Sequence, residues 1–378
     1  MRPATEQDLS EAVMAASGPL KVVGGGTRDI GRPVAGDVLS VAGLSGVELY
    51  EPGALTIVVK AGTPLAEVEA ALEAENQRLP FEPLDYRGLL GTDGVPTVGG
   101  MVASNASGPR RVQAGACRDS LIGVRFVDGS GAIIKNGGRV MKNVTGYDLV
   151  KLMAGSWGTL GVLSEVSFKV LPGVAVRACV MVDGLSDAQA VEAMSTALGS
   201  PFEVTGAAHI PVGLDGHPVT MLRLEGFSDS VAYRTKQLSN LLAPVGSIRV
   251  EDDPEAVKAG WVWVRDVGIF KDKPGDVWRI SVKPSDGPQV AARTGGEVMY
   301  DWGGGLVWAL VPTGTDVRAR LGSFAGHATL IRASQDTRRR FAVFQPEAPG
   351  VAAISAGLRA KFDPRGILNH GLMATEFA

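Results

Sequence analysis

Two glycine-rich segments in the first third of the chain are the residues best suited to bind a ligand. The first reads VVGGGTRD at positions 22–29, and the second reads TVGGMVASNASGPRR at positions 97–111. A phosphate group close to a backbone needs N–H donors with no side chain in the way, and glycine allows both the approach and the unusual torsions. One isolated glycine cluster is more typical of a turn. Because each of these two follows an apolar, strand-like run, together they predict a phosphate-bearing cofactor.

The segments fit neither of the two common phosphate-binding motifs. A Rossmann site requires G-x-G-x-x-G at a strand-to-helix turn. Here Asp29 stands at the third glycine position and no helical pattern follows. A P-loop is excluded as well, because the chain holds no G-x-x-x-x-G-K-[ST] string. A different dinucleotide-binding architecture is therefore expected.

The elements that must position these segments can be predicted from the pattern of apolar residues. Strands are expected at 20–23, 38–41, 56–60 and 162–171, and a hairpin at 121–135 around Asp128-Gly129-Ser130-Gly131. A helix is expected to 76, with Thr63 as its N-cap and Pro64 at its first position. From about 174 the pattern changes to strand 177–182, helix 187–198, strands 204–210 and 220–224, and helix 230–242. This alternation predicts a second α+β domain with an antiparallel sheet covered by helices, and a last helix is expected at 352–362.

Composition narrows the class of protein. The chain has 378 residues, 45% hydrophobic and 20% charged, which is ordinary for a globular enzyme of two domains. Its net charge is only -3, which argues against a nucleic-acid partner. The two cysteines, Cys117 and Cys179, are too few for a disulfide framework or for the thiolates of an iron-sulfur cluster. With no signal-peptide pattern and no long apolar run, we expect a cytoplasmic protein whose membrane contact is peripheral and made through partners.

The order of motifs along the chain resembles a known family. GGGT, TVGGMVASNASGPRR, GVRFVDGSG, VMKNVTGYDLVKLMAGSWGTLGVLSEVSFKVLP, DWGGGLVWAL and FDPRGILN occur in that order. The chain is identified as similar to the PCMH-type flavoproteins of the vanillyl-alcohol oxidase family, and within them to the FAD-binding E subunits of bacterial glycolate oxidases. The resemblance implies a PCMH-type FAD-binding domain of two α/β subdomains at 1–173. It also implies an α+β cap domain at 174–345 and a return to the flavin site at 346–378.

The resemblance also implies which residues contact FAD. It places the diphosphate on the first loop, the second phosphate and flavin contacts on the second segment, and further contacts on a strand entry and a C-terminal asparagine. Backbone amides of this kind neutralise a diphosphate without burying a side-chain charge. The residues so implied are Gly24, Gly25, Gly26, Thr27, Thr97, Gly99, Gly100, Ser104, Asn105, Gly108, Gly161, Val162 and Asn369.

The chain lacks histidines that have functional roles in some relatives of this family. Some relatives tether FAD through a histidine in the first loop, where this chain has Thr27, Arg28 and Asp29. FAD is therefore expected to be non-covalent. Related hydroxy-acid dehydrogenases bind a metal with a histidine and glutamate constellation, and this chain lacks that pattern. We accordingly expect no metal and assign no catalytic residue.

Several other polar residues have both a functional and a structural interpretation. Of the four histidines, His209 is expected in the core, His217 and His327 in turns, and His370 near the flavin, where a catalytic role stays open. A polar set at Lys142, Asn143, Tyr147, Asp148 and Lys151 fits either ligand positioning or the caps of a short helix. The run from Arg338 to Arg340 is expected to be a solvated face.

The resemblance implies a subunit of a glycolate oxidase or dehydrogenase complex. A paralogous FAD-containing catalytic subunit would perform or share the oxidation of glycolate to glyoxylate, and an iron-sulfur subunit would pass electrons toward quinone. Two alternatives stay open. The chain could be a self-sufficient FAD-dependent oxidoreductase acting on another alcohol or 2-hydroxy acid, or a non-catalytic assembly subunit in which FAD only stabilises the fold.

Overall fold

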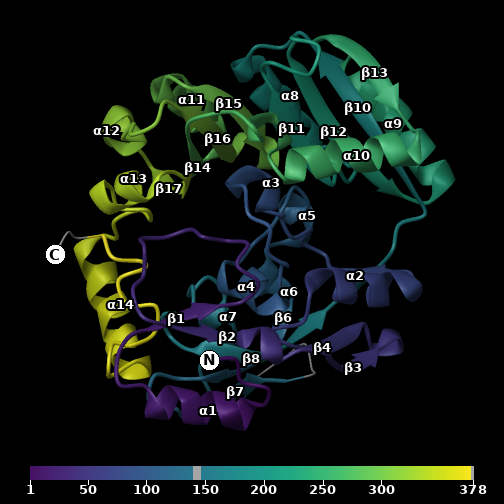
Figure 1. Cartoon of the computed structure of the whole chain (residues 1–378). Helices are drawn as coiled ribbons and strands as arrows, with labels where there is room; N and C mark the ends of the chain where they lie inside the picture. Colours follow the sequence, from purple (N-terminus) through teal and green to yellow (C-terminus); the bar gives the residue numbers. More distant parts are fainter. Residues whose placement is uncertain (139–145, 376–378) are drawn as a thin grey trace. The chain divides into compact units, whose positions relative to one another are not determined.

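The computed structural model describes residues 1–138 and 146–375, and it divides the chain into two compact units. The first unit consists of residues 1–107, 115–173 and 338–378, and the second of residues 108–114 and 174–337. Both chain termini belong to the first unit (Figure 1). The chain therefore enters the second unit twice, once briefly at 108–114 and once for most of its later half.

The first unit is built on a five-stranded sheet in the order β3-β4-β8-β6-β7, and every neighbouring pair in it is antiparallel. The central strand β8 is buried along most of its length because its residues VLSEVSFK are apolar or small at nearly every position. The strands are β3 (Val47–Glu51), β4 (Thr56–Lys60), β6 (Leu121–Val127), β7 (Ile133–Gly137) and β8 (Val162–Lys169). A separate two-stranded antiparallel sheet is formed by β5 (Gln77–Arg78) and β9 (Leu171–Pro172).

The predicted hairpin is confirmed, and its turn is closed by Asp128. The Oδ1 atom of Asp128 accepts hydrogen bonds from the Ser130 backbone N–H at 2.9 Å, from the Ser130 hydroxyl at 2.6 Å and from the Ala132 N–H at 2.9 Å. An aspartate that bonds the backbone two residues on is a common turn device. The strands β6 and β7 follow from it in antiparallel register.

A smaller parallel pair, β1 (Leu20–Val23) and β2 (Asp37–Ser40), carries the first glycine segment at the end of β1. The C-terminal segment runs beside it, because the Leu20 N–H donates to the Ile367 carbonyl at 2.7 Å and the Asn369 N–H donates to the Leu20 carbonyl at 3.0 Å. Leu9 and Val13 of helix α1 (Glu6–Ala15) and Leu368 share one apolar cluster with these strands. The two ends of the chain are thereby joined around the first glycine segment.

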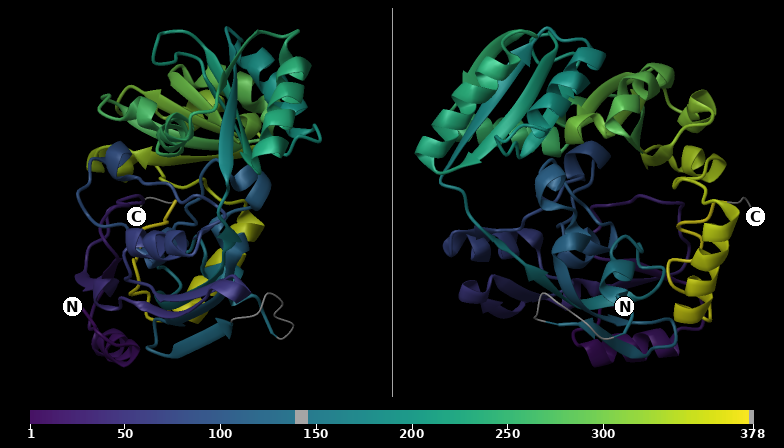
Figure 2. Two further views of the ribbon diagram at one scale, coloured as in Figure 1. Left: turned by 90° about the vertical axis from the view of Figure 1, so that its right-hand side faces the viewer. Right: turned by 180° about the vertical axis from the view of Figure 1, so that it is seen from behind.

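The helices of the first unit are mostly short. The 10-residue helix α2 begins at Leu65 and has Pro64 as its N-cap, so the prediction of Thr63 as the cap is wrong. The Thr63 hydroxyl instead donates to the Lys60 carbonyl at 2.7 Å. The bounds of α2 and the other helices are α2 (Leu65–Ala74), α3 (Arg87–Leu90), α4 (Val98–Ala103), α5 (Arg111–Ala114, in the second unit), α6 (Cys117–Ser120), α7 (Leu149–Met153), α13 (Gln335–Arg340, which crosses from the second unit into the first) and α14 (Pro349–Phe362), with 3-10 turns η1 (Val41–Gly43) and η2 (Pro52–Ala54). Figure 2 shows α14 at the edge of the first unit, where none of its residues is buried.

The second unit is an eight-stranded antiparallel sheet with helices packed against it, as predicted. Its order is β13-β10-β12-β11-β15-β16-β14-β17. The strands are β10 (Val176–Asp183), β11 (Gly206–Ile210), β12 (Val219–Gly226), β13 (Ser247–Glu251), β14 (Asp276–Val282), β15 (Glu297–Asp301), β16 (Leu306–Val311) and β17 (Gly326–Arg332). The helices are α8 (Asp187–Leu198), α9 (Ser228–Leu242), α10 (Pro254–Arg265), α11 (Gly287–Thr294) and α12 (Val317–Leu321), with 3-10 turns η3 (Gly268–Phe270), η4 (Pro284–Asp286) and η5 (Trp302–Gly304).

The core of the second unit is formed by large aromatic residues. Trp278, Trp308 and Tyr300 are among the largest fully buried side chains of the chain. His209 is also fully buried, as expected, with its Nδ1 atom 2.9 Å from the Thr220 hydroxyl. His327 lies in strand β17, so its assignment to a turn is wrong. The glycine next to His327 suggested a turn in the sequence, but this segment forms a strand because it pairs with β14.

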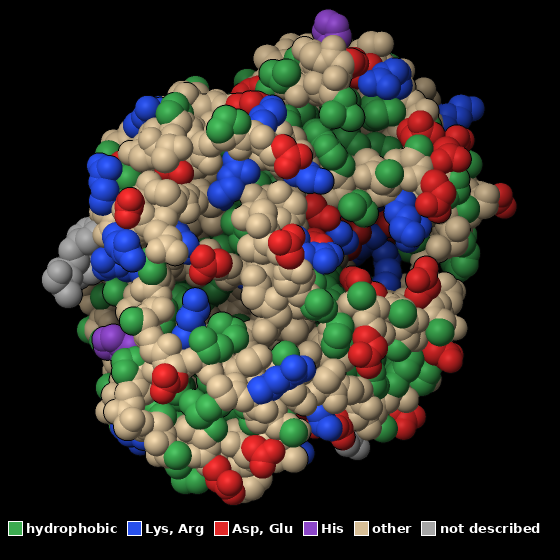
Figure 3. All heavy atoms as spheres, viewed as in Figure 1, with side chains coloured by type: hydrophobic (Ala, Val, Ile, Leu, Met, Phe, Trp, Pro, Cys, Tyr) green, Lys and Arg blue, Asp and Glu red, His purple; other side chains and the backbone are tan. Residues whose placement is uncertain are grey.

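The surface carries both signs of charge. Lys and Arg side chains are intermingled with Asp and Glu side chains over the face drawn in Figure 3. Within residues 1–138 and 146–375, no helix is long and apolar enough to cross a membrane.

Candidate cofactor-binding site

A cavity of about 360 Å³ lies within the first unit, between the two glycine segments. Its wall is contributed by the end of β1, the loop after it, helix α4, the turn before β8 and the C-terminal segment. The lining residues are Lys21, Val22, Val23, Gly24, Gly25, Gly26, Thr27, Arg28, Asp29, Ile30, Arg32, Val34, Val41, Thr97, Gly99, Gly100, Ala103, Trp157, Gly158, Gly161, Val162, Leu163, Asn369 and Leu372.

The glycines of the first segment allow its backbone to pack closely against the second segment. A Cβ atom on Gly25 would lie 1.5 Å from the Val95 carbonyl oxygen, and one on Gly24 would lie 2.3 Å from the Thr97 hydroxyl. Gly26 is different, because its φ is +72° and a Cβ atom there would meet nothing within 4 Å. Gly24 and Gly25 therefore hold the two segments together, while Gly26 faces open space where a ligand would lie.

The second segment begins helix α4 with Thr97 as its N-cap. The Thr97 side chain accepts a hydrogen bond from the Gly100 N–H at 3.3 Å, which fixes the first turn. The Gly99 N–H donates to the Ala61 carbonyl at 2.7 Å, and a Cβ atom on Gly99 would lie 2.8 Å from the Ala61 Cβ. Gly99 is thus required for packing against the chain that leaves β4.

Asn369 ties three parts of the wall together. Its Oδ1 atom accepts a hydrogen bond from the Val22 N–H at 2.8 Å, and its Nδ2 atom donates to the Trp157 carbonyl at 2.8 Å. Asn369 and Trp157 both have positive φ angles, at 43° and 54°. Asparagine tolerates that conformation better than most residues. A side-chain amide at this position fixes the C-terminal segment against β1 and the turn before β8.

The cavity brings together most of the residues that the sequence predicted to contact a cofactor. Those that line it are Gly24, Gly25, Gly26, Thr27, Thr97, Gly99, Gly100, Gly161, Val162 and Asn369. Three predicted residues do not line it and have other contacts. The Ser104 hydroxyl donates to the Gly100 carbonyl at 2.8 Å, the Asn105 side chain accepts from the Arg118 N–H at 3.0 Å, and Gly108 belongs to the second unit.

Charged residues line the cavity that sequence reasoning did not assign to it. Lys21, Arg28 and Arg32 contribute positive charge and Asp29 contributes negative charge. The signal available in the sequence was the basic residue that directly follows the first glycine loop. A cavity with this balance of charge favours an anionic ligand.

Arg338 holds the chain that follows the first glycine segment. Its guanidinium donates to the Asp29 carbonyl at 2.8 Å, to the Gly31 carbonyl at 3.3 Å and to the Asp29 carboxylate at 2.8 Å. The side chain of Arg338 is 7% exposed, so the expectation of a solvated face is wrong at this position, although Arg339 and Arg340 are exposed. A run of three arginines gives no indication of which one turns inward.

The remaining predicted polar residues do not converge on the cavity. His370 is exposed and is not among the residues lining it. Asp148 caps helix α7, accepting from the Lys151 N–H at 3.1 Å, and Tyr147 is 88% exposed, while Lys142 and Asn143 lie outside the described residues. In the part of the chain that the structure describes, no three His, Cys, Asp or Glu side chains gather into a group that could hold a metal ion.

Comparison with known proteins decides the family. Residues 1–137 match a protein family described as FAD binding domain. The glycolate oxidase subunit GlcE of Escherichia coli is 35% identical over 362 residues, which cover 95% of this chain and 93% of that protein. The chain belongs to the GlcE family.

More distant relatives and solved structures agree with this assignment. The glycolate oxidase subunit GlcD of Bacillus subtilis is 35% identical over 118 residues, covering 31% of this chain and 24% of that protein. A D-lactate dehydrogenase of Archaeoglobus fulgidus is 31% identical over 178 residues, covering 46% and 38%. Alkyldihydroxyacetonephosphate synthase (15% identical, 98% and 76% covered) and p-cresol methylhydroxylase (14%, 100% and 88%) each superpose with a TM-score of 0.70. The α+β fold is that of the PCMH-type flavoproteins, as predicted.

Two structural features of the cavity in this GlcE-family chain fit FAD independently of the comparisons. Gly26 leaves open space, and the Nε atom of Arg28 is buried without a hydrogen-bond acceptor. Both features suit a ligand that brings anionic oxygens close to a backbone. The protein is an FAD-dependent oxidoreductase of the class that acts on CH-OH groups.

Proposed function

We propose that this chain is the FAD-binding subunit of a multi-subunit glycolate oxidase or dehydrogenase. The observation that carries the proposal is the match to a glycolate oxidase subunit over nearly the whole length of both chains. The partial match to a second type of glycolate oxidase subunit is consistent with a paralogous flavin subunit in the same complex.

The FAD site that we propose is the cavity of the first unit. Gly24, Gly25, Gly26 and Thr27 would meet the diphosphate, together with Thr97, Gly99 and Gly100. Gly161, Val162 and Asn369 would contact the flavin part of the cofactor. When bound, FAD supplies the acceptor for the two electrons that leave a CH-OH group, and the protein binds and orients it.

In the complex, glycolate would lose two electrons and two protons to give glyoxylate. The electrons would then leave through a partner iron-sulfur subunit toward quinone, since this chain has two cysteines and both are buried. We assign the proton-accepting group to the paralogous subunit, because His209 belongs to the core of the second unit and His370 is exposed. The location that follows is the cytoplasm, with contact to the inner membrane made peripherally through partners.

The proposal is tested by recording the flavin spectrum of the chain purified alone and purified with its partners, before and after adding glycolate. We expect glycolate to bleach the flavin absorbance in the complex and to leave it unchanged in the isolated chain. Bleaching of the isolated chain would instead select a self-sufficient oxidoreductase. A complex that shows no response to glycolate would contradict the substrate.

The flavin is proposed to be held without a covalent bond, because Thr27, Arg28 and Asp29 follow the glycines where a tethering histidine would stand. Acid precipitation of the holoprotein is expected to release all the flavin into the supernatant. Yellow colour retained in a washed pellet would contradict this part of the proposal.

A further inference from the structure

The side chain of Arg28 is partly buried and lacks the partners that a desolvated guanidinium normally has. Its Nη1 atom is 3.5 Å from the Thr27 hydroxyl and its Nη2 atom is 3.5 Å from the Leu84 carbonyl, both at the outer limit of a hydrogen bond. Its Nε atom is buried and has no acceptor. The guanidinium carries five N–H donors. Most of its hydrogen-bonding capacity is therefore available.

No carboxylate of the described chain lies within ion-pair distance of Arg28. Asp85 interacts with Arg28 only at longer range. The Asp85 carboxylate is bound by Arg87, whose Nε atom donates to Oδ1 at 3.2 Å and whose Nη2 atom donates to Oδ2 at 2.8 Å. The Tyr86 ring, with its centroid 5.9 Å from the Arg28 Cζ, offers a weaker cation-π contact.

The desolvated position is costly for a charge. Burial lowers the pKa of the Arg28 guanidinium from its ordinary value. An arginine nevertheless stays protonated in proteins. A buried charge without a partner is unfavourable, and such groups in folded proteins are paired or bind a ligand. The physical expectation is that an anion from outside the chain completes this site.

The position of Arg28 identifies that anion. Its guanidinium lies beside Thr27 of the first glycine segment, and its Nη1 atom is 3.4 Å from the place that a Cβ atom on Gly100 of the second segment would occupy. Gly100 thus leaves room for the guanidinium against the first turn of α4. The charge stands between the same two segments that are proposed to meet the diphosphate.

We propose that Arg28 binds the diphosphate of FAD and selects flavins that carry phosphate. This inference rests on the FAD site of the proposed function and changes one expectation drawn from the sequence. Neutralisation of the diphosphate is not left to backbone amides alone, because one partly buried side-chain cation contributes to it. The planar guanidinium suits this role, since it donates two parallel hydrogen bonds to phosphate oxygens.

Anionic oxygens could also come from the carboxylate of a 2-hydroxy acid, so the experiment separates the two sources. The full-length chain is freed of flavin, and the dissociation constants of FAD, FMN and riboflavin are measured by quenching of flavin fluorescence. The variants are Arg28→Gln and Arg28→Lys. The matched control is Arg118→Gln, which removes one positive charge from an arginine whose side chain is 52% exposed.

We expect Arg28→Gln to weaken FAD binding by roughly 10- to 100-fold, the range for loss of a charge-assisted hydrogen bond. FMN affinity should fall less, and riboflavin affinity should be unchanged because riboflavin has no phosphate. Arg28→Lys should restore part of the FAD affinity, since lysine keeps the charge without the planar fork. Arg118→Gln should bind all three flavins as the unaltered chain does. Circular dichroism of each variant checks that it is folded.

Three results would overturn the inference. FAD affinity unchanged in Arg28→Gln would remove Arg28 from the cofactor site. An equal loss for FAD and riboflavin would mean that Arg28 only shapes the cavity. Unchanged FAD affinity together with a raised KM for glycolate in the assembled complex would assign Arg28 to a substrate carboxylate. Failure of the unaltered chain to bind any flavin would instead contradict the proposed FAD site itself, which separates the two proposals.

Discussion

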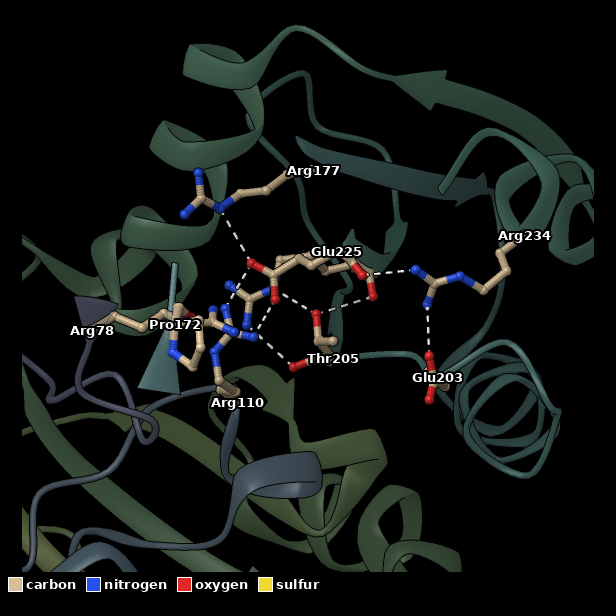
Figure 4. Close-up of polar contacts among 9 residues, drawn as sticks. Arg78, Arg110, Pro172, Arg177, Glu203, Thr205, Glu225 and Arg234 are labelled. Carbon is tan, nitrogen blue, oxygen red and sulfur yellow. Dashed lines mark hydrogen bonds and ion pairs between the residues drawn. The ribbon is translucent and has the colours of Figure 1, made fainter. Parts of the chain in front are cut away.

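Arg28 and the arginines around Glu225 differ in what binds their guanidinium groups. In the second unit Arg110 and Arg177 contact Glu225, whose side chain is 1% exposed (Figure 4). The Nε atom of Arg223 also lies 3.7 Å from the Glu225 carboxylate. Arg110 donates to the Glu225 carboxylate at 2.6 Å and Arg177 donates to it at 3.2 Å. In the first unit Arg28 has two hydrogen bonds of 3.5 Å and no carboxylate at ion-pair distance among the described residues. The protein supplies the anion for the cluster around Glu225, whereas we propose that a ligand supplies it for Arg28.

The residues around Glu225 form a structural charge cluster, and Arg28 is the residue that we propose binds a ligand. The Glu225 cluster is bound on several sides, because Arg223 also donates to the Thr205 hydroxyl at 3.1 Å and to the Thr205 carbonyl at 3.2 Å.

The Glu225 cluster also explains where the predicted cofactor segment ends. Residues 108–114 belong to the second unit, and Arg110 in that stretch is held by Glu225. The string TVGGMVASNASGPRR therefore serves the cavity at its start and the second unit at its end.

The largest effect is expected from Glu225→Gln. Removing the carboxylate leaves Arg110 and Arg223, 2% and 3% exposed, without their buried anion. Breaking a buried pair in this way typically costs about 3–5 kcal/mol of unfolding free energy. Thermal and urea unfolding measure the loss. FAD affinity below the melting temperature should be unchanged, because the cavity is lined by the first unit.

Loss of FAD affinity at temperatures where Glu225→Gln is still fully folded would contradict a purely structural role for the cluster. A suitable control is Glu203→Gln, because Glu203 accepts from Arg234 at 3.4 Å in the same unit but is 75% exposed. Exposed pairs contribute little to stability, so Glu203→Gln should be close to neutral.

An intermediate effect is expected from Arg338→Met. The ion pair with Asp29 adds little because the Asp29 side chain is 60% exposed. The main loss is that of the hydrogen bonds to the carbonyls of Asp29 and Gly31, of which the bond to Gly31 is buried. A buried acceptor that loses its donor costs about 1–3 kcal/mol. Urea unfolding of the flavin-free chain measures it. FAD affinity should also fall, because these bonds position the chain next to Arg28.

Arg340→Met provides the matched control for this prediction, since Arg340 is exposed on the same short helix α13. Equal stability of Arg338→Met and Arg340→Met would show that the buried contacts of Arg338 do not hold the loop.

The sequence predicted the parts of the fold that are encoded locally. The bounds of α8 match the prediction, and the β6–β7 hairpin follows from the Asp-Gly-Ser-Gly turn, because periodicity and turn chemistry act over a few residues. Strands β13 to β17 were not predicted. Several of them are buried along most of their length and are specified by pairing with strands far away in the chain, as His327 in β17 illustrates.

The sequence predicted those parts of the candidate site that are marked by glycine residues. Ten of the thirteen predicted residues line the cavity, because glycine and a threonine cap are visible in the sequence. The sequence did not distinguish Gly25, which is required by the Val95 carbonyl, from Gly26, which faces open space. Nor did it show that Arg338 is buried and Arg28 is partly buried while Arg339 and Arg340 are exposed. Burial of a charged side chain depends on tertiary contacts rather than on its neighbours in sequence.

The smallest effect, and the one of opposite sign, is expected from Arg28→Met in the flavin-free chain. Methionine reproduces the unbranched stem of arginine without the guanidinium, so it removes the desolvated charge and its acceptor-free Nε atom. Because no protein carboxylate loses a partner, the flavin-free chain should gain about 1 kcal/mol of unfolding free energy, at the low end for replacement of buried charge by apolar groups.

Saturating FAD should then stabilise the Arg28→Met variant less than it stabilises the unaltered chain, since stabilisation by a ligand follows its affinity. Urea unfolding with and without FAD measures both quantities, with Arg118→Met as the exposed control. A flavin-free Arg28→Met chain that is less stable than the unaltered one would place Arg28 with the structural arginines of the Glu225 cluster, because its charge would then be compensated by the protein itself.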